Sequence, residues 1–218
     1  MSEMNSTIRL RRVKHGYTSG ARSLASRSVT RLARTRVTPN VLTTTGVSLC
    51  LAAAVLVPFE NRADTLLVYW LAAGLFVIGS LLDILDGALA RVGGKSTPFG
   101  AFIDSTTDRV GEGAMLAAIA LVFSRHGQDW AVVVAVAAVV GSFLVSYTRA
   151  RAEALGLKGD VGLGSRAERV VLITAGLVFA PWGGLSWAIA VLAATAWLTV
   201  VQRVLHVRKQ LVHGGPDV

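Results

Sequence analysis

Six apolar stretches dominate this sequence of 218 residues, and all but the fifth, which is short, are about long enough to cross a lipid bilayer as helices. A helix needs about 20 mostly apolar residues to cross a hydrocarbon core of about 30 Å. Prolines and glycines separate the stretches, and their length favours helices over strands. We therefore expect an all-α polytopic membrane protein with six transmembrane helices: Val41–Pro58, Leu66–Ala90, Phe99–Phe123, Asp129–Ala152, Arg169–Pro181 with its flanks, and Leu185–His206.

Composition excludes the main alternatives to a membrane protein. Hydrophobic residues make up 53% of the chain and charged residues 16%, against about 25% charged residues in an ordinary soluble domain. The mean hydropathy of +0.57 is too high for a soluble, disordered or coiled-coil chain. A fold held by disulfides is also excluded, because Cys50 is the only cysteine.

The positive charges alternate between the two sides of the predicted membrane domain. Nineteen Lys and Arg residues fall on one side, and two fall on the other. Loops rich in Lys and Arg stay in the cytoplasm, so we expect a protein of the cell (plasma) membrane with both termini cytoplasmic. This bias explains the net charge of +9 without nucleic-acid binding.

The predicted membrane domain spans residues 41–208, with a cytoplasmic tail over 209–218. Residues 1–40 form a basic cytoplasmic arm. Within it, Ala21–Leu32 mixes leucine and valine with three arginines, which is typical of an amphipathic helix on the membrane surface. A disordered basic arm is the alternative.

Acidic residues inside membrane spans are costly and usually functional. Five of the 13 acidic residues fall in the second and third apolar stretches. Asp83 and Asp86 are three residues apart, and Asp104 and Asp108 are four apart with Glu112 one turn later, so each pair shares a helix face. Two adjacent helices can therefore direct four carboxylates into one cavity near the cytoplasmic boundary.

Four clustered carboxylates stay ionised in a low dielectric only when cations compensate their charge. Mg²⁺, Mn²⁺ and Ca²⁺ prefer such oxygen ligands, and two ions balance four carboxylates better than one. Two alternatives stay open: buried salt bridges with Arg91 and Arg109, or the pathway of a carboxylate-lined cation transporter. Gly87, Ala90 and Gly100 remove side chains near the acids, and the space favours a substrate larger than an ion.

One pattern runs through both stretches: Asp83-x2-Asp86-Gly87-x2-Ala90-Arg91-x8-Gly100-x3-Asp104-x3-Asp108. It resembles the signature of the CDP-alcohol phosphotransferase family, and the resemblance extends to Thr38-Pro39-Asn40 before the first stretch. It implies six membrane helices, two divalent ions and a homodimer. The implied reaction transfers a phosphatidyl group from CDP-diacylglycerol to an alcohol and releases CMP.

The resemblance also implies roles for individual residues. Asp83, Asp86, Asp104 and Asp108 would bind two Mg²⁺ ions, with Mn²⁺ as the alternative, and Asp108 would accept the proton of the attacking hydroxyl. The residues themselves agree, since a pyrophosphate approaches four carboxylates only when metal lies between them. The implied contacts to CDP-diacylglycerol come from Asn40, Gly87, Ala90, Arg91, Thr97 and Gly100.

Arginines gather at the cytoplasmic ends of the last three stretches. Guanidinium groups bind phosphate oxygens in pairs, although topology alone also places arginines there. These segments resemble the phosphatidylinositol-phosphate synthases of actinobacteria, whose acceptor is inositol 1-phosphate, and this implies Arg149, Arg169 and Arg203 as acceptor-phosphate residues. Arg149 stands where that subfamily typically has lysine. Glycerol 3-phosphate, the acceptor of phosphatidylglycerophosphate synthases, is the alternative.

Overall fold

The computed structural model describes residues 39–62, 64–92, 97–212 and 214, and every element within them is helical. The expected all-α class is confirmed for this part of the chain, whereas the predicted interfacial helix Ala21–Leu32 lies outside it. The elements are α2 (Pro39–Leu56), the 3-10 turn η1 (Val57–Phe59), α3 (Thr65–Val92), α4 (Pro98–Arg125), α5 (Asp129–Ala154), α6 (Arg166–Val178), the 3-10 turn η2 (Ala180–Trp182) and α7 (Gly184–Val212).

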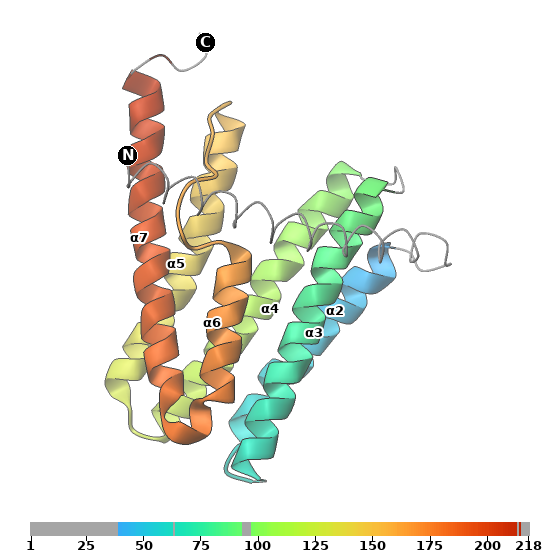
Figure 1. Cartoon of the computed structure of the whole chain (residues 1–218), viewed down its shortest axis with the longest axis vertical. Coiled ribbons are helices and arrows are strands. Elements are labelled where there is room, and N and C mark those ends of the chain that lie inside the picture. Colours follow the sequence, from blue (N-terminus) through green and yellow to red (C-terminus); the bar gives the residue numbers. More distant parts are fainter. Residues whose placement is uncertain (1–38, 63, 93–96, 213, 215–218) are drawn as a thin grey trace, which may run out of the picture.

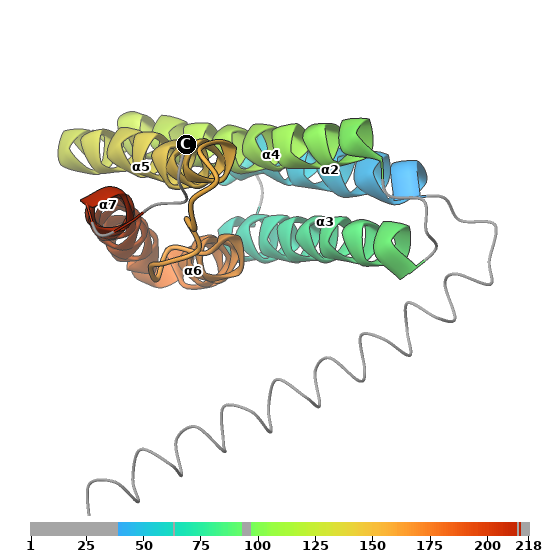
Figure 2. The same cartoon turned by 90° about the horizontal axis from the view of Figure 1, so that it is seen from above.

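The six long helices pack in two layers. Figure 2 shows α5, α4 and α2 in one layer and α7, α6 and α3 in the other. Contacts of α2 with α3 and of α5 with α7 join the layers at both ends, so the helices form a closed ring. Helix α6 is the shortest of them. The segment 155–165 connects the end of α5 to the start of α6 (Figure 1).

Within the described part of the chain, four segments are long and apolar enough to cross a membrane: Asn40–Phe59, Thr65–Leu89, Asp129–Ala154 and Gly184–Val212. Large apolar side chains point away from the bundle, and Trp187 for example is 71% exposed. Alanines such as Ala72 and Ala135 are fully buried, which lets the helix backbones approach closely. Both features are typical of a membrane protein.

Helix α2 lies against both α3 and α4, which have few direct contacts with each other. Its backbone comes so close to α3 that a Cβ on Gly79 would lie 2.6 Å from the carbonyl oxygen of Gly46. On α4, a Cβ on Gly111 would lie 3.1 Å from the Cβ of Cys50. Glycine permits these approaches because it has no side chain. Gly79 is about one turn before Asp83, so this crossing sets the position of the acidic residues on α3.

Two N-terminal caps fix where α4 and α6 begin. Helix α4 starts with Pro98, and the hydroxyl of Thr97 accepts a hydrogen bond from the Gly100 amide at 3.0 Å. Helix α6 starts with a capping box: the Ser165 amide donates to the Glu168 carboxylate at 2.7 Å, and the Glu168 amide donates to the Ser165 hydroxyl at 3.4 Å. Both arrangements satisfy amides that have no partner inside the helix.

Candidate active site

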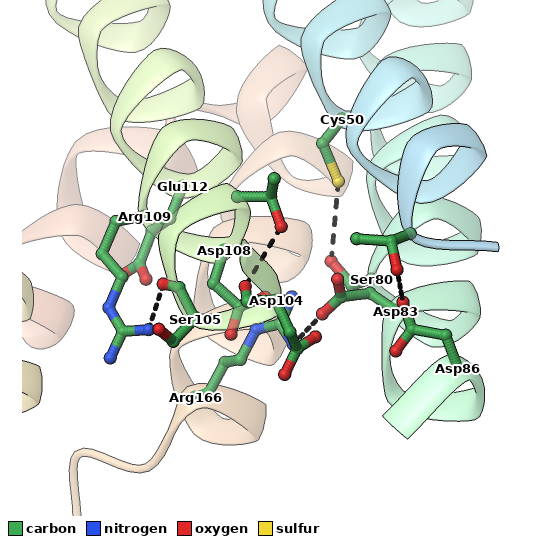
Figure 3. Close-up of polar contacts among 12 residues, drawn as sticks. Cys50, Ser80, Asp83, Asp86, Asp104, Ser105, Asp108, Arg109, Glu112 and Arg166 are labelled. Carbon is green, nitrogen blue, oxygen red and sulfur yellow. Dashed lines mark hydrogen bonds and ion pairs between the residues drawn. The ribbon is translucent and has the colours of Figure 1, made fainter. Parts of the chain in front are cut away.

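Three of the four predicted metal ligands come together: Asp83 from α3, and Asp104 and Asp108 from α4 (Figure 3). Each offers one carboxylate oxygen, and these oxygens lie within 4.8 Å of one another. Asp83 is buried, and the other two are partly buried. Clustered carboxylates need a compensating cation, and hard oxygen ligands at this spacing suit a divalent one.

Asp86, the fourth predicted ligand, lies one turn further along α3 and outside this group of three. Its side chain is almost fully buried, and its Oδ2 accepts a hydrogen bond from the hydroxyl of Thr43 on α2. Its Oδ1 is buried and has no hydrogen-bond partner among the described residues. A buried carboxylate oxygen without a partner is costly, and a cation beside it would remove that cost. The donor set therefore fits divalent metal.

Arg166 is a further residue of this site, and it lies outside the eight-position pattern. It reaches from the first turn of α6 to carboxylates on both other helices (Figure 3). Its Nη1 pairs with Asp83, and its Nη2 lies 2.5 Å from Oδ1 of Asp108. Sequence position marks Arg166 only as a cytoplasmic arginine, and nothing in the spacing indicates which helices α6 packs against.

One alternative was that Arg91 and Arg109 neutralise the carboxylates, and the structure does not support it for Arg109. This guanidinium donates to the carbonyl oxygen of Ser105, one turn earlier on the same helix. The side chain of Arg91 lies outside the described residues. Arg166 supplies the observed ion pairs instead.

Arg169, an implied acceptor-phosphate residue, forms a buried ion pair with Glu112. Its Nε and Nη2 donate to the two Glu112 carboxylate oxygens at 2.7 and 2.9 Å, and its Nη1 donates to the carbonyl of Gly164 at 2.8 Å. Both side chains are buried. All three nitrogen atoms are engaged, so an acceptor phosphate would have to share Arg169 with Glu112.

The other two arginines of that set differ in their surroundings. Arg203 is buried, and its guanidinium donates to the backbone carbonyls of Val161, at 2.9 Å, and Val145. Arg149 is exposed and donates to Glu153 at 2.8 Å. The guanidinium of Arg203 contacts Val161 and that of Arg169 contacts Gly164, both in the segment 155–165 that follows α5. The same segment packs against Arg149, since a Cβ on Gly159 would lie 3.1 Å from its Cα, so all three arginines lie beside this segment.

The implied contacts to CDP-diacylglycerol are only partly described. Thr97 and Gly100 form the start of α4, Gly87 follows Asp86 on α3, and Asn40 is exposed in the first turn of α2. The side chains of Ala90 and Arg91 lie outside the described residues. The described residues of this set therefore lie at the starts of α2 and α4 and in the last two turns of α3.

A narrow pocket lies beside the carboxylates, between α2, α3, α4 and α6. Asp83, Asp108 and Arg166 form part of its wall, and Cys50 and Phe76 form another part. Cys50 is buried and has a free thiol. The pocket extends the site into the bundle.

The sequence model of the CDP-alcohol phosphatidyltransferase family matches residues 36–205, which hold all the helices of the ring as far as most of α7. The chain belongs to this family. The resemblance inferred from the eight-position pattern is therefore confirmed.

Two relatives of this CDP-alcohol phosphatidyltransferase carry specific names. Phosphatidylinositol phosphate synthase of Mycobacteroides abscessus is 38% identical over 183 residues, which are 81% of this chain and 80% of that protein. Archaetidylinositol phosphate synthase of Pyrococcus horikoshii is 35% identical over 185 residues, which are 84% of this chain and 90% of that protein.

Solved structures of Mycobacterium tuberculosis phosphatidylinositol phosphate synthase are similar to the whole bundle. The crystal structure with CDP-DAG bound has a TM-score of 0.73 at 30% identity, and the match covers 85% of this chain and 94% of that one. The crystal structure in complex with manganese and citrate has a TM-score of 0.73 at 32% identity, with 84% and 88% covered.

Proposed function

We propose that this CDP-alcohol phosphatidyltransferase is a phosphatidylinositol phosphate synthase. It transfers the phosphatidyl group of CDP-diacylglycerol to inositol 1-phosphate and releases CMP. The observation that carries the proposal is the cluster of Asp83, Asp104 and Asp108 within the family pattern. The names of the relatives favour a phosphorylated inositol as the acceptor.

Four carboxylates would hold the metal: Asp83, Asp86, Asp104 and Asp108. We propose two Mg²⁺ ions, with Mn²⁺ able to replace them, and the manganese in the relative's crystal structure supports a divalent ion. Bound divalent ions would neutralise the pyrophosphate and stabilise the charge that develops on the leaving CMP. The buried Oδ1 of Asp86, which has no hydrogen-bond partner among the described residues, supports this assignment.

Asp108 is the proposed general base. The acceptor oxygen forms a bond to the phosphorus that carries diacylglycerol, and the bond from that phosphorus to the bridging oxygen breaks. CMP leaves with the electron pair, and the hydroxyl proton passes to the Asp108 carboxylate. Asp108 is better suited to this task than Asp83, since its side chain is 15% exposed and that of Asp83 is 5% exposed, so an incoming hydroxyl can reach it.

CDP-diacylglycerol would bind at the ends of α2, α3 and α4. A small residue at Gly87 and a helix start at Thr97 and Gly100 leave space for a nucleotide beside the carboxylates. Helix N-termini also favour anionic groups, because their amides point outward. The remaining proposed contacts are Asn40, Ala90 and Arg91.

The acceptor phosphate would bind among Arg149, Arg169 and Arg203. Their shared position beside the segment 155–165 supports this role, and the carbonyl contacts of Arg203 hold its guanidinium in a fixed position. Arg149 is the most accessible of the three, and its partner Glu153 is exposed as well. A phosphate could therefore replace Glu153 at little desolvation cost.

We also propose the setting of the enzyme. Six transmembrane helices would place both termini in the cytoplasm and the protein in the cell (plasma) membrane, as the charge bias predicts. Two of these spans would differ from the other four. Helix α4 is less apolar, and α6 has only 13 residues. A homodimer is the expected assembly.

The decisive experiment is an acceptor panel. Purified protein is supplied with CDP-diacylglycerol and Mg²⁺, and CMP release is measured with inositol 1-phosphate, glycerol 3-phosphate, free inositol and serine. We expect the highest kcat/KM with inositol 1-phosphate and no release in EDTA. Faster release with glycerol 3-phosphate would replace the proposed acceptor, and faster release with free inositol would remove the phosphate site altogether.

A further inference from the structure

Arg166 joins the two halves of the acidic cluster. Its guanidinium pairs with Oδ2 of Asp83 on α3 and with Oδ1 of Asp108 on α4. Its side chain is 30% exposed, whereas that of Asp83 is 5% exposed. One cation from a third helix therefore bridges two helices that have few contacts of their own.

The guanidinium uses the carboxylates that would bind metal. Magnesium requires its oxygen ligands at about 2.0–2.1 Å in octahedral geometry, and a charged N–H donor holds a carboxylate oxygen at about 2.7–2.9 Å. The two cations therefore cannot occupy the space between Asp83 and Asp108 together. Like charges at this distance also repel strongly in a low dielectric.

Arg166 can leave this position without movement of its helix. Arg169, one turn later, is held by Glu112 and by the carbonyl of Gly164, and the capping box at Ser165 fixes the first turn. Helix α6 is thus anchored independently of Arg166. A rotation of the partly exposed Arg166 side chain is enough to clear the carboxylates.

We propose that Arg166 is an internal counter-ion of the metal-free enzyme, which divalent metal must displace. This inference rests on the proposed function, because it takes the carboxylates to be metal ligands. Arg166 has two effects. It stabilises the metal-free bundle by pairing charges that would otherwise repel, and it weakens metal binding because each binding event breaks two ion pairs.

The test compares Arg166→Gln with the wild type in full-length, detergent-solubilised protein without lipid substrate. Free Mn²⁺ is measured by electron paramagnetic resonance during a titration. We expect Arg166→Gln to bind Mn²⁺ at least about 10-fold more tightly, since a charge-assisted contact no longer competes. Arg166→Lys, which keeps the charge on a single ammonium group, should lie between the two.

Arg109→Gln is the matched control. It removes the same charge from the neighbouring region of α4, but its guanidinium contacts the Ser105 carbonyl and forms no ion pair with a carboxylate of the described residues. A general loss of positive charge would tighten Mn²⁺ binding equally in both variants. A specific displacement predicts that only Arg166→Gln changes the affinity by that amount.

Thermal unfolding supplies a second measurement. In EDTA, Arg166→Gln should melt below the wild type, because the carboxylates lose their counter-charge. Saturating Mn²⁺ should remove most of this difference, since metal then compensates the same carboxylates in both proteins. A purely structural role of Arg166 predicts a difference that metal does not change.

The outcomes separate the inference from the function on which it rests. Equal or weaker Mn²⁺ binding by Arg166→Gln, with a wild type that binds, would overturn the counter-ion role and leave the proposed metal site intact. Absence of Mn²⁺ binding in both proteins would overturn both. If Arg166→Gln does not fold, Arg166→Lys carries the same comparison.

Discussion

The four aspartates of the site differ in what surrounds them. Asp86 is deeply buried against the Thr43 hydroxyl, whereas Asp83 and Asp108 share the Arg166 guanidinium. Asp104, on α4, supplies the third carboxylate oxygen of the group that it forms with Asp83 and Asp108. Equivalent residues in the sequence pattern therefore have different neighbours, and their substitutions should have different consequences.

Replacement of a metal-ligand charge should abolish activity. We expect Asp83→Asn, Asp86→Asn and Asp104→Asn each to lower CMP release by at least ~100-fold, because changes outside the ligand shell alone cost 10- to 100-fold. Asp129→Asn, at the exposed start of α5, is the control and should stay within a few-fold of the wild type. Retention of most activity in the three site variants would mean that the metal assignment is wrong.

Asp108→Asn should affect turnover more than binding. If Asp108 accepts the hydroxyl proton, its amide variant loses kcat while the apparent affinity for CDP-diacylglycerol changes little. Saturation curves of CMP release against CDP-diacylglycerol measure both constants. Normal turnover with lost affinity would instead assign Asp108 to metal binding alone.

Substitution of Arg169 or of Arg203 should weaken acceptor binding, but only substitution of Arg169 should strongly lower stability. Arg203→Ala and Arg169→Ala should raise the KM for inositol 1-phosphate roughly 10- to 150-fold, which corresponds to about 1.5–3 kcal/mol for one charged contact. Arg169→Ala also leaves Glu112 buried without its partner, which should cost about 3–5 kcal/mol of stability. Melting curves and acceptor KM values separate the two effects.

The control for the arginine variants is Arg151→Ala, two residues beyond Arg149 on an exposed part of α5. It should leave the acceptor KM unchanged, and the KM for CDP-diacylglycerol should change little in every variant. An unchanged acceptor KM in both Arg169→Ala and Arg203→Ala would reduce these residues to structural or membrane anchors.

At the scale of helices, the positions and lengths of the apolar stretches predicted most of the helices in the structure. The expected stretch Phe99–Phe123 became α4, Pro98–Arg125, and Asp129–Ala152 became α5, Asp129–Ala154. Hydropathy and helix breakers are local signals, so they identify helix ends without knowledge of packing. Even the short stretch before Pro181 is a helix, α6, with its start marked by a capping box.

Contacts between helices were not predictable in the same way. The spacing of Asp104 and Asp108 indicated a shared face on one helix, but it did not indicate that Arg166 would reach them or that Glu112 would pair with Arg169. Those partners depend on which helices are neighbours in the ring. Thr43 was missed for the same reason, since a threonine in an apolar stretch does not reveal its partner on α3.

The crossing of α2 and α3 gives a prediction about the whole helix α3. A Cβ at Gly79 would lie 2.6 Å from the Gly46 carbonyl oxygen and 2.8 Å from the Cys50 sulfur, so Gly79→Ala should force the helices apart. Overpacking of this kind costs about 1–3 kcal/mol. We expect a lower melting temperature and less CMP release, because α3 carries Asp83.

Gly74→Ala is the matched control, since a Cβ at this position of α3 meets nothing within 4 Å. It should melt at the same temperature as the wild type or higher, because alanine favours the helix over glycine. Equal melting temperatures and activities for the two variants would show that the crossing tolerates a methyl group and does not position the carboxylates.

At the scale of the molecule, the proposed orientation can be tested at the two ends of α5. A helix of 26 residues is about 39 Å long, so Gln128 and Leu155 lie on opposite sides of a membrane that α5 crosses. Both residues are exposed, whereas the native Cys50 is buried. A membrane-impermeant maleimide should label Gln128→Cys in intact cells and Leu155→Cys only after permeabilisation. The reverse labelling pattern would mean that the protein has the opposite orientation in the membrane.

The position of Arg166 in the chain has a consequence for biosynthesis. A ribosome makes the protein from its N-terminus, so α3 and α4 emerge with their carboxylates before the arginine that pairs with them exists. Acidic helices are costly to place in a bilayer alone. The counter-charge arrives only with α6, and the ring of helices closes only with α7. The most polar region of the bundle is therefore completed among the last steps of its assembly.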